Sequence, residues 1–330
     1  MLRISLRTVL LGVVGAVLPA VALTQDDDAP PTYRLTQTYV RELAKQNSIL
    51  FRLPVRIKGR TASVHTVDKD CEMHLAGSSG IKIGFPGQVV VEPPNLCKNA
   101  PPAALGSSWG NVFDTHVLNT ACTAVGFPRL YAEHLENGKP PANPPHMVEI
   151  HPALSLECAG SAPINFASYL TIYPGMAAIQ DASAEKCLSG FKMWVRRRTV
   201  GGNPEYQFLE ERPNVCGNFA VVEAVVDPRY VRAVSGGHSS IAQVWVGEAG
   251  PFPLKLYTYA GTAEDSSIVA IGNSGNEEPE STLKLHGMLT VDYFAVLKAS
   301  RTESGNWRAL SSWTAVKFPL ALVVFGAAVE

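Results

Sequence analysis

The sequence lacks an excess of charge of either sign. Its 330 residues carry 28 Lys and Arg against 29 Asp and Glu, and this balance disfavours a general binder of nucleic acid or anionic membranes. The 27 Gly and 24 Pro form no Gly-X-Y repeat, which excludes a collagen. No Cys-x-x-Cys, P-loop or Gly-x-Ser-x-Gly motif points to a zinc ribbon, a phosphate loop or a serine hydrolase. A hydrophobic fraction of 46% is ordinary for a globular chain and too high for a disordered one.

Residues 1–22 have the pattern of a secretory signal peptide. Arg3 and Arg7 give a positive start, an apolar run follows at 8–17, and 20–22 read Ala-Val-Ala, a small-residue cleavage site. An uncleaved membrane anchor is the alternative, but the apolar run is short for a spanning helix. Cleavage would leave 26 basic against 29 acidic residues, a formal charge of −3, and no predicted membrane span. We therefore expect an exported protein, periplasmic or secreted, from a bacterial host.

Six cysteines follow the predicted signal, and an even number in an exported chain favours disulfides. Six cysteines allow fifteen pairings, and none is fixed by sequence alone. We expect the sequential set, because each bond would then join neighbouring strands. The predicted pairs are Cys71–Cys97, Cys122–Cys158 and Cys187–Cys216.

The rest of the chain is mostly strand-like, with frequent Pro and Gly and little helical periodicity. A short helix is predicted near 35–49, and the strands expected in the first half are 54–67, 71–76, 87–92, 116–131 and 147–157. In the second half a hairpin is predicted around the 201–204 turn, and further strands at 219–226, 241–246, 254–259, 283–297 and 315–325. We find no convincing internal repeat.

These elements predict a mainly β protein with two domains and few short helices. Five strands with a helix nearby suggest an OB-like barrel first and a second β-rich domain after it. The predicted divisions are the signal peptide at 1–22, an N-terminal segment at 23–52, the OB-like barrel at 53–175, a linker at 176–188 and the second domain at 189–330.

Residues 64–75 run as strand, Asp68-Lys69-Asp70 turn and strand, and 89–94 read Val-Val-Val-Glu-Pro-Pro. This order resembles the start of the staphylococcal-nuclease-like OB barrels. That family uses an Asp-x-Asp turn and a later Val-Asp-x-Pro for calcium binding and catalysis, so the resemblance implies acidic, metal-binding roles for Asp68, Asp70 and Glu92. The arginine that the family places before the later acid has no counterpart in 85–88.

The segment 148–152, Val-Glu-Ile-His-Pro, is similar to a Glu-[Ile/Val]-His-Pro strand found in uncharacterised bacterial exported proteins with such barrels. This second resemblance implies a shared architecture and no particular activity.

Strand alternation predicts one polar face on the first barrel. Side chains at i and i+2 share a face, so polar and apolar groups separate on three of the predicted strands. If the apolar sets fill the barrel, the polar sets point outward and can converge where OB folds bind ligands. The predicted face comprises Glu72, His74, Glu92, Glu149 and His151.

Imidazole and carboxylate groups together can bind a divalent metal or act as an acid and base pair. A solvated polar face without any function produces the same alternation.

Three functions remain open. The first is a non-catalytic exported protein that binds a small molecule, glycan or protein through the OB-like face and requires no cofactor. The second is a metal-dependent hydrolase, similar to a phosphodiesterase, built on Asp68, Asp70 and Glu92. The third is a structural protein of the cell envelope. We expect a binding role, with nucleic acid disfavoured as the ligand.

Overall fold

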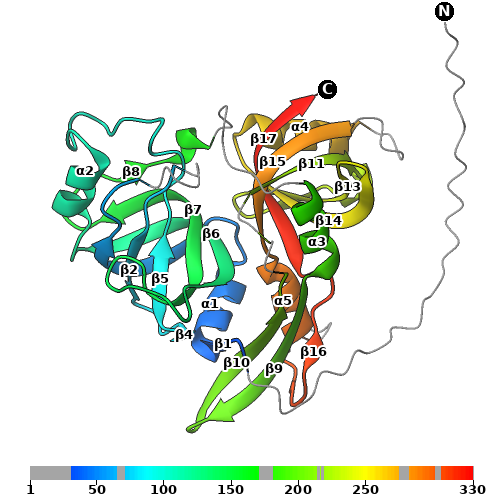
Figure 1. The fold of residues 1–330 in the computed structure, drawn as a ribbon, viewed down its shortest axis with the longest axis horizontal. Coiled ribbons are helices and arrows are strands. Elements are labelled where there is room, and N and C mark those ends of the chain that lie inside the picture. Colours follow the sequence, from blue (N-terminus) through cyan, green and yellow to red (C-terminus); the bar gives the residue numbers. More distant parts are fainter. Residues whose placement is uncertain are drawn as a thin grey trace, which may run out of the picture.

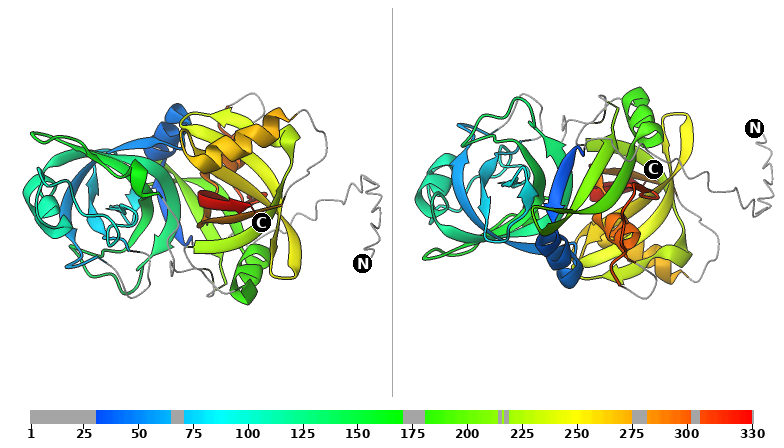
Figure 2. Two further views of the ribbon diagram at one scale, coloured as in Figure 1. Left: turned by 90° about the horizontal axis from the view of Figure 1, so that it is seen from above. Right: turned by 90° about the horizontal axis from the view of Figure 1, so that it is seen from below.

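The structure is a computed structural model that describes residues 31–64, 71–170, 181–213, 216, 219–274, 282–301 and 306–329. Two closed five-stranded barrels stand side by side, and a third, open sheet lies beneath them (Figure 1). Views from above and below show each barrel as its own ring of strands (Figure 2). The predicted mainly β architecture with an OB-like first barrel is therefore confirmed.

The first barrel joins strands of the first half of the chain in the order β5-β3-β2-β6-β7, and β7 closes the ring by pairing in parallel with β5. Helix α2 (Trp109–His116) lies between the third and fourth of these strands in sequence. The strands are β2 (Phe51–Arg60), β3 (Leu75–Ser79), β5 (Gln88–Val91), β6 (Ala121–Glu133) and β7 (His146–Cys158).

The second barrel repeats this strand order although the sequence shows no repeat. Its ring runs β11-β15-β17-β14-β13, the pair β11–β13 closes it, and β14 and β17 are parallel. Helix α4 (Ala263–Asn273) again lies between the third and fourth strands. The strands are β11 (Phe219–Val226), β13 (Gly237–Val246), β14 (Ala249–Tyr259), β15 (Thr282–Val291) and β17 (Leu320–Val329), with β12 (Arg232–Val234) at the edge.

The third sheet takes strands from distant parts of the chain, in the order β16-β9-β10-β1-β4. The predicted hairpin is present as β9 (Lys192–Val200) and β10 (Asn203–Glu211). It does not belong to the second barrel, because β10 pairs through residues 205–208 with β1 (Tyr33–Thr36) from the N-terminal segment. The edge strands β4 (Gly84–Phe85) and β16 (Thr314–Ala315) come from the first and second halves of the chain. This sheet therefore ties the two barrels together.

The helices are short, and sequence reasoning anticipated two of them. The predicted helix at 35–49 is α1 (Gln37–Gln46); the Thr36 side chain accepts a hydrogen bond from the Tyr39 amide at its start. The segment predicted as a helix or linker is α3 (Asp181–Gly190). The strand predicted at 283–297 is wrong in its last part, where Asp292 caps the start of α5 (Tyr293–Ser300). Minor elements are β8 (Ile164–Asn165) and the single turns at 167–169 and 228–230.

Strand β2 shows the alternation that sequence reasoning relies on. Its buried side chains are at every second position from Phe51 to Ile57, and the residues between them are exposed. Strand β7 departs from this pattern, since residues 146–154 are buried on both faces. Its inner face fills the first barrel, and its outer face is covered by the second barrel. This difference determines the surroundings of the candidate site.

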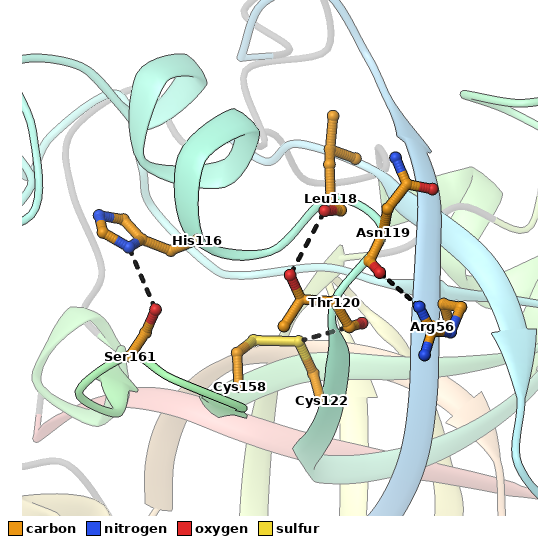
Figure 3. The surroundings of a disulfide bond; sticks show 8 residues. All are labelled: Arg56, His116, Leu118, Asn119, Thr120, Cys122, Cys158 and Ser161. Atoms are coloured by element: carbon orange, nitrogen blue, oxygen red, sulfur yellow. Dashed lines mark hydrogen bonds between the residues drawn. A yellow bond between two sulfur atoms is a disulfide. The ribbon is translucent and has the colours of Figure 1, made fainter.

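All three predicted disulfides are present as Cys71–Cys97, Cys122–Cys158 and Cys187–Cys216. Cys122 and Cys158 lie directly opposite each other on β6 and β7. Around this bond His116 contacts the Ser161 hydroxyl and Arg56 donates to the Asn119 carbonyl (Figure 3). Three such bonds are typical of proteins that fold in an oxidising compartment. Among the described residues, every helix is too short or too polar to cross a membrane.

We predict that reduction lowers the melting temperature markedly. The bonded cysteines are separated by 26, 36 and 29 positions, and loops of this length correspond to roughly 3–4 kcal/mol of stabilisation each. Thermal unfolding with and without a strong reductant, followed by circular dichroism, measures the effect. An unchanged melting curve after thiol counting has proved full reduction would contradict it.

Candidate functional site

The five residues of the predicted polar face are buried, which corrects the expectation that they face solvent. Their exposed fractions are 1% for Glu72, 8% for His74, 2% for Glu92 and 0% for Glu149 and His151. The second barrel covers the outer face of β6 and β7 and excludes water from it. Contacts from the first barrel to the second pair Phe127 with Tyr257 and Tyr293, and His151 with Phe219.

The five groups nevertheless come together, as the strand order predicts. Glu92 follows β5 and lies between two histidines: its Oε1 is 3.1 Å from His74 Nε2, and its Oε2 is 2.6 Å from His151 Nδ1. His74 lies just before β3, and its Nδ1 is 3.2 Å from the Asn143 amide oxygen in the β6–β7 loop. Parallel pairing of β5 with β7 places Glu92 beside His151, because the Glu92 amide donates to the Ile150 carbonyl.

His151 has a carboxylate at each ring nitrogen. Its Nε2 is 2.9 Å from Glu72 Oε1, while its Nδ1 is close to both Glu92 and, at 3.4 Å, Glu149 Oε2. Burial alone would lower the pKa of His151, but the charges of Glu72 and Glu92 outweigh burial and raise this pKa well above its ordinary value. These contacts favour the charged form of the ring, with a carboxylate oxygen facing each nitrogen.

Sequence reasoning missed two further members of the cluster, Arg129 and His146. Arg129 lies opposite Glu149 in the β6–β7 register, and its guanidinium is 2.6 Å from Glu149 Oε2. His146 Nε2 is 3.0 Å from Glu149 Oε1, and His146 Nδ1 is 2.8 Å from the Pro144 carbonyl. His146 and Glu149 are three positions apart, and residues at that spacing point to opposite faces of a regular strand. Register shifts in this part of the β6–β7 pair explain why simple alternation did not find the contact.

Opposite charges balance one another within the cluster. Burial alone would raise the pKa of Glu92, but the charges of His74 and His151 outweigh it and lower this pKa to about 2. Burial alone would lower the pKa of His146, but the hydrogen bond and charge of Glu149 raise it to about 9. Glu133, at the outer edge, behaves differently: burial and the charge of Glu149 raise its pKa above the ordinary value. Ion pairing therefore outweighs burial at Glu92, His146 and His151 but not at Glu133, where Arg129 and His146 only partly oppose it.

Cation–π contacts extend the cluster across the junction of the two halves of the chain. The Arg129 guanidinium lies 3.8 Å from the centre of the Tyr131 ring, and the Arg212 guanidinium lies 4.1 Å from the same ring. The Tyr131 hydroxyl donates to the Cys216 carbonyl, and Arg212 donates to the Ala132 carbonyl. The disulfide-linked segment before β11 is thereby held to β6.

Among the residues that the structure describes, two groups of three side chains have donor atoms close enough to share a metal ion. The inner group is Glu72, Glu92 and His151, and the outer group is Glu133, His146 and Glu149. Of the residues that the family resemblance implies for a metal, Glu92 belongs to the inner group. Asp68 and Asp70 lie outside the described residues.

A cavity of about 620 Å³ opens at the end of the first barrel; none of the cluster's residues lines it, but Met73, between Glu72 and His74 in the chain, does. It is bounded by the chain after β2, by the segment around the Cys71–Cys97 disulfide and by the first turn of α2. Its polar side chains include Arg60, Lys98, Asn99, Ser107, Ser108 and Asn111, and its apolar side includes Met73, Leu96 and Trp109. The cavity lining, as far as the structure describes it, contains no carboxylate.

Comparison with family models, with curated proteins and with solved structures gave no match for this chain. The site is therefore interpreted from its own geometry.

We predict that Arg129→Met costs about 3–5 kcal/mol of unfolding free energy, because it leaves the buried Glu149 without its guanidinium partner. The matched control is Arg52→Met, which breaks an exposed Arg–Glu pair with Glu157 and should cost about 1 kcal/mol or less. Urea unfolding of both variants measures the difference. Equal costs would show that the buried pair has no special role.

We predict that stability is greatest between pH 4.5 and 6.5 in metal-free buffer. Glu92 has its pKa lowered from 4.5 to about 2, so its contribution is complete above pH 4.5 and is lost as pH falls toward 2. His146 has its pKa raised from 6.5 to about 9, so its contribution is complete below pH 6.5 and is lost as pH rises through 9.

Urea unfolding at a series of pH values tests this profile. His146→Gln should flatten the alkaline side and leave the acidic side in place. A wild-type unfolding free energy that keeps rising from pH 6.5 to 9 would contradict the prediction.

Proposed function

We propose that the protein is an exported, non-enzymatic binding protein that holds a small anionic molecule in the cavity of its first barrel. The observation that carries the proposal is the cavity itself. Its volume of about 620 Å³ falls in the range of small-molecule sites, roughly 300–1,000 Å³. The ligand would thus lie at the end of the barrel, away from the covered face of β6 and β7.

The lining supports an anionic ligand with an apolar part. Lys98 brings positive charge, Arg60 brings a guanidinium that is paired with Asp114, and the hydroxyl and amide groups beside them can donate hydrogen bonds. Arg60 also binds Asp114 through two contacts of 2.7 and 2.6 Å, which fix its guanidinium at the cavity wall. Trp109 donates its indole N–H to the Asn99 carbonyl and presents apolar surface beside Met73. A carboxylate or phosphate carried on a small apolar group matches these features.

The ion cluster gives less support to the hydrolase alternative. Its inner groups, Glu72, Glu92 and His151, are buried beneath the second barrel and paired with one another. With exposed fractions of 2% or less, these groups present almost no surface to a substrate. The acids Asp68 and Asp70, on which the hydrolase hypothesis also depends, lie outside the described residues.

We predict that phenyl phosphate binds and that Lys98→Glu weakens this binding at least about tenfold, because the substitution reverses a charge at the cavity wall. Lys58→Glu is the matched control: Lys58 is exposed on β2 and lies outside the cavity lining, so its reversal should leave affinity unchanged. Isothermal titration calorimetry measures both.

Phenyl glucoside serves as the neutral probe in the same experiment. Equal affinity for the two probes would reject the anionic ligand. Binding of neither would reject the cavity as the site and favour the structural role in the envelope.

A further inference from the structure

The ion cluster has one edge that reaches solvent. The side chains of Glu133 and His134 are 23% and 30% exposed, whereas those of His146 and Glu149 just behind them are 0% exposed. Glu133 therefore joins the buried groups to the protein surface. This edge is separate from the cavity, so an ion site here is independent of the proposed ligand.

Three donor groups meet at this edge. One ligand atom each from Glu133, His146 and Glu149 lies within 4.8 Å of the others, and His146 Nε2 is 3.0 Å from Glu149 Oε1. A zinc ion at about 2.0–2.2 Å from nitrogen and oxygen donors spaces two of its ligands roughly 3–3.5 Å apart. The His146–Glu149 spacing meets that requirement already, and Glu133, on the solvent side, has a carboxylate oxygen within 4.8 Å of both and would move closer to complete the set.

Neighbouring groups fix the orientation of both buried donors, His146 and Glu149. His146 Nδ1 faces the Pro144 carbonyl at 2.8 Å, so a ring that gives up its Nε2 proton to an ion keeps its other proton on Nδ1, and its Nε2 lies beside Glu149 Oε1. Arg129 holds Glu149 Oε2 at 2.6 Å and leaves Oε1 directed at His146. Metal-binding histidines and carboxylates in proteins are fixed by such contacts.

Burial distinguishes the outer group from the inner one. Glu72, Glu92 and His151 are 1%, 2% and 0% exposed, and each His151 nitrogen already faces a carboxylate oxygen. The outer group includes Glu133, whose side chain is 23% exposed. The outer group is therefore the better candidate for a single ion.

We propose that one divalent transition-metal ion of the Zn²⁺ class binds at Glu133, His146 and Glu149, with solvent on the side of Glu133. The imidazole donor and the small number of ligands favour zinc and its neighbours over Ca²⁺ and Mg²⁺, which prefer six or more oxygen ligands.

Titration calorimetry with Zn²⁺ on chelator-treated, untagged protein tests the proposal. We expect one equivalent to bind and Ca²⁺ not to compete. Glu133→Gln should weaken Zn²⁺ binding at least about tenfold, because it removes a ligand from the partly exposed edge without disturbing the buried groups. The matched control is Glu157→Gln, at the exposed end of β7, which should bind Zn²⁺ as the wild type does.

A second measurement reports the coordination of the ion and does not depend on its binding affinity. Co²⁺ substituted for Zn²⁺ should give the visible absorption of a four-coordinate site in wild type and in Glu157→Gln, and lose it in Glu133→Gln. The proposal is overturned by the absence of stoichiometric Zn²⁺ binding, by unchanged binding in Glu133→Gln, or by two equivalents bound to the wild type. Phenyl phosphate binding measured in EDTA separates these outcomes from any failure of the cavity proposal.

Discussion

The structure depends on the pairing of charges that are removed from water between two barrels. A carboxylate or imidazolium in a dry interior is costly unless an opposite charge and hydrogen bonds accompany it. Glu149 illustrates the solution, since Arg129 and His146 each take one of its oxygens. Apolar residues would fill the same space at less cost, so the cluster is better explained by a role in fixing the barrels or holding an ion than by stability alone.

The same junction explains how far the sequence could predict the site. Alternation placed Glu92, Glu149 and His151 together correctly, because pairing along a strand is a local property. It failed on their burial, because nothing in a strand's own pattern shows that a second domain will cover its outer face. Arg129 belongs to a strand whose two faces are both buried, and such a strand shows no alternation in its sequence.

At the level of the fold, the disulfides and most strands were predictable from spacing and composition. Helices α2 and α4 were not, because each is short and carries no sustained helical period in sequence. The common strand order of the two barrels was also invisible, since similar rings of strands form from different residues as long as the inward positions are apolar. The pairing of β1 with β10 had no local signal at all, because the Tyr33–Glu210 contact joins positions 177 residues apart.

That long-range pairing has a consequence for the order of folding. Contacts between distant residues form slowly, because the intervening chain must lose its freedom before they can stabilise anything. Each barrel can close from its own consecutive strands, but the sheet beneath them needs the N-terminal strand, the central hairpin and a piece of the last segment at once. Assembly of the molecule is thus expected to finish at this sheet, and a chain still missing its second half would have the edge of β1 open to pairing with other molecules.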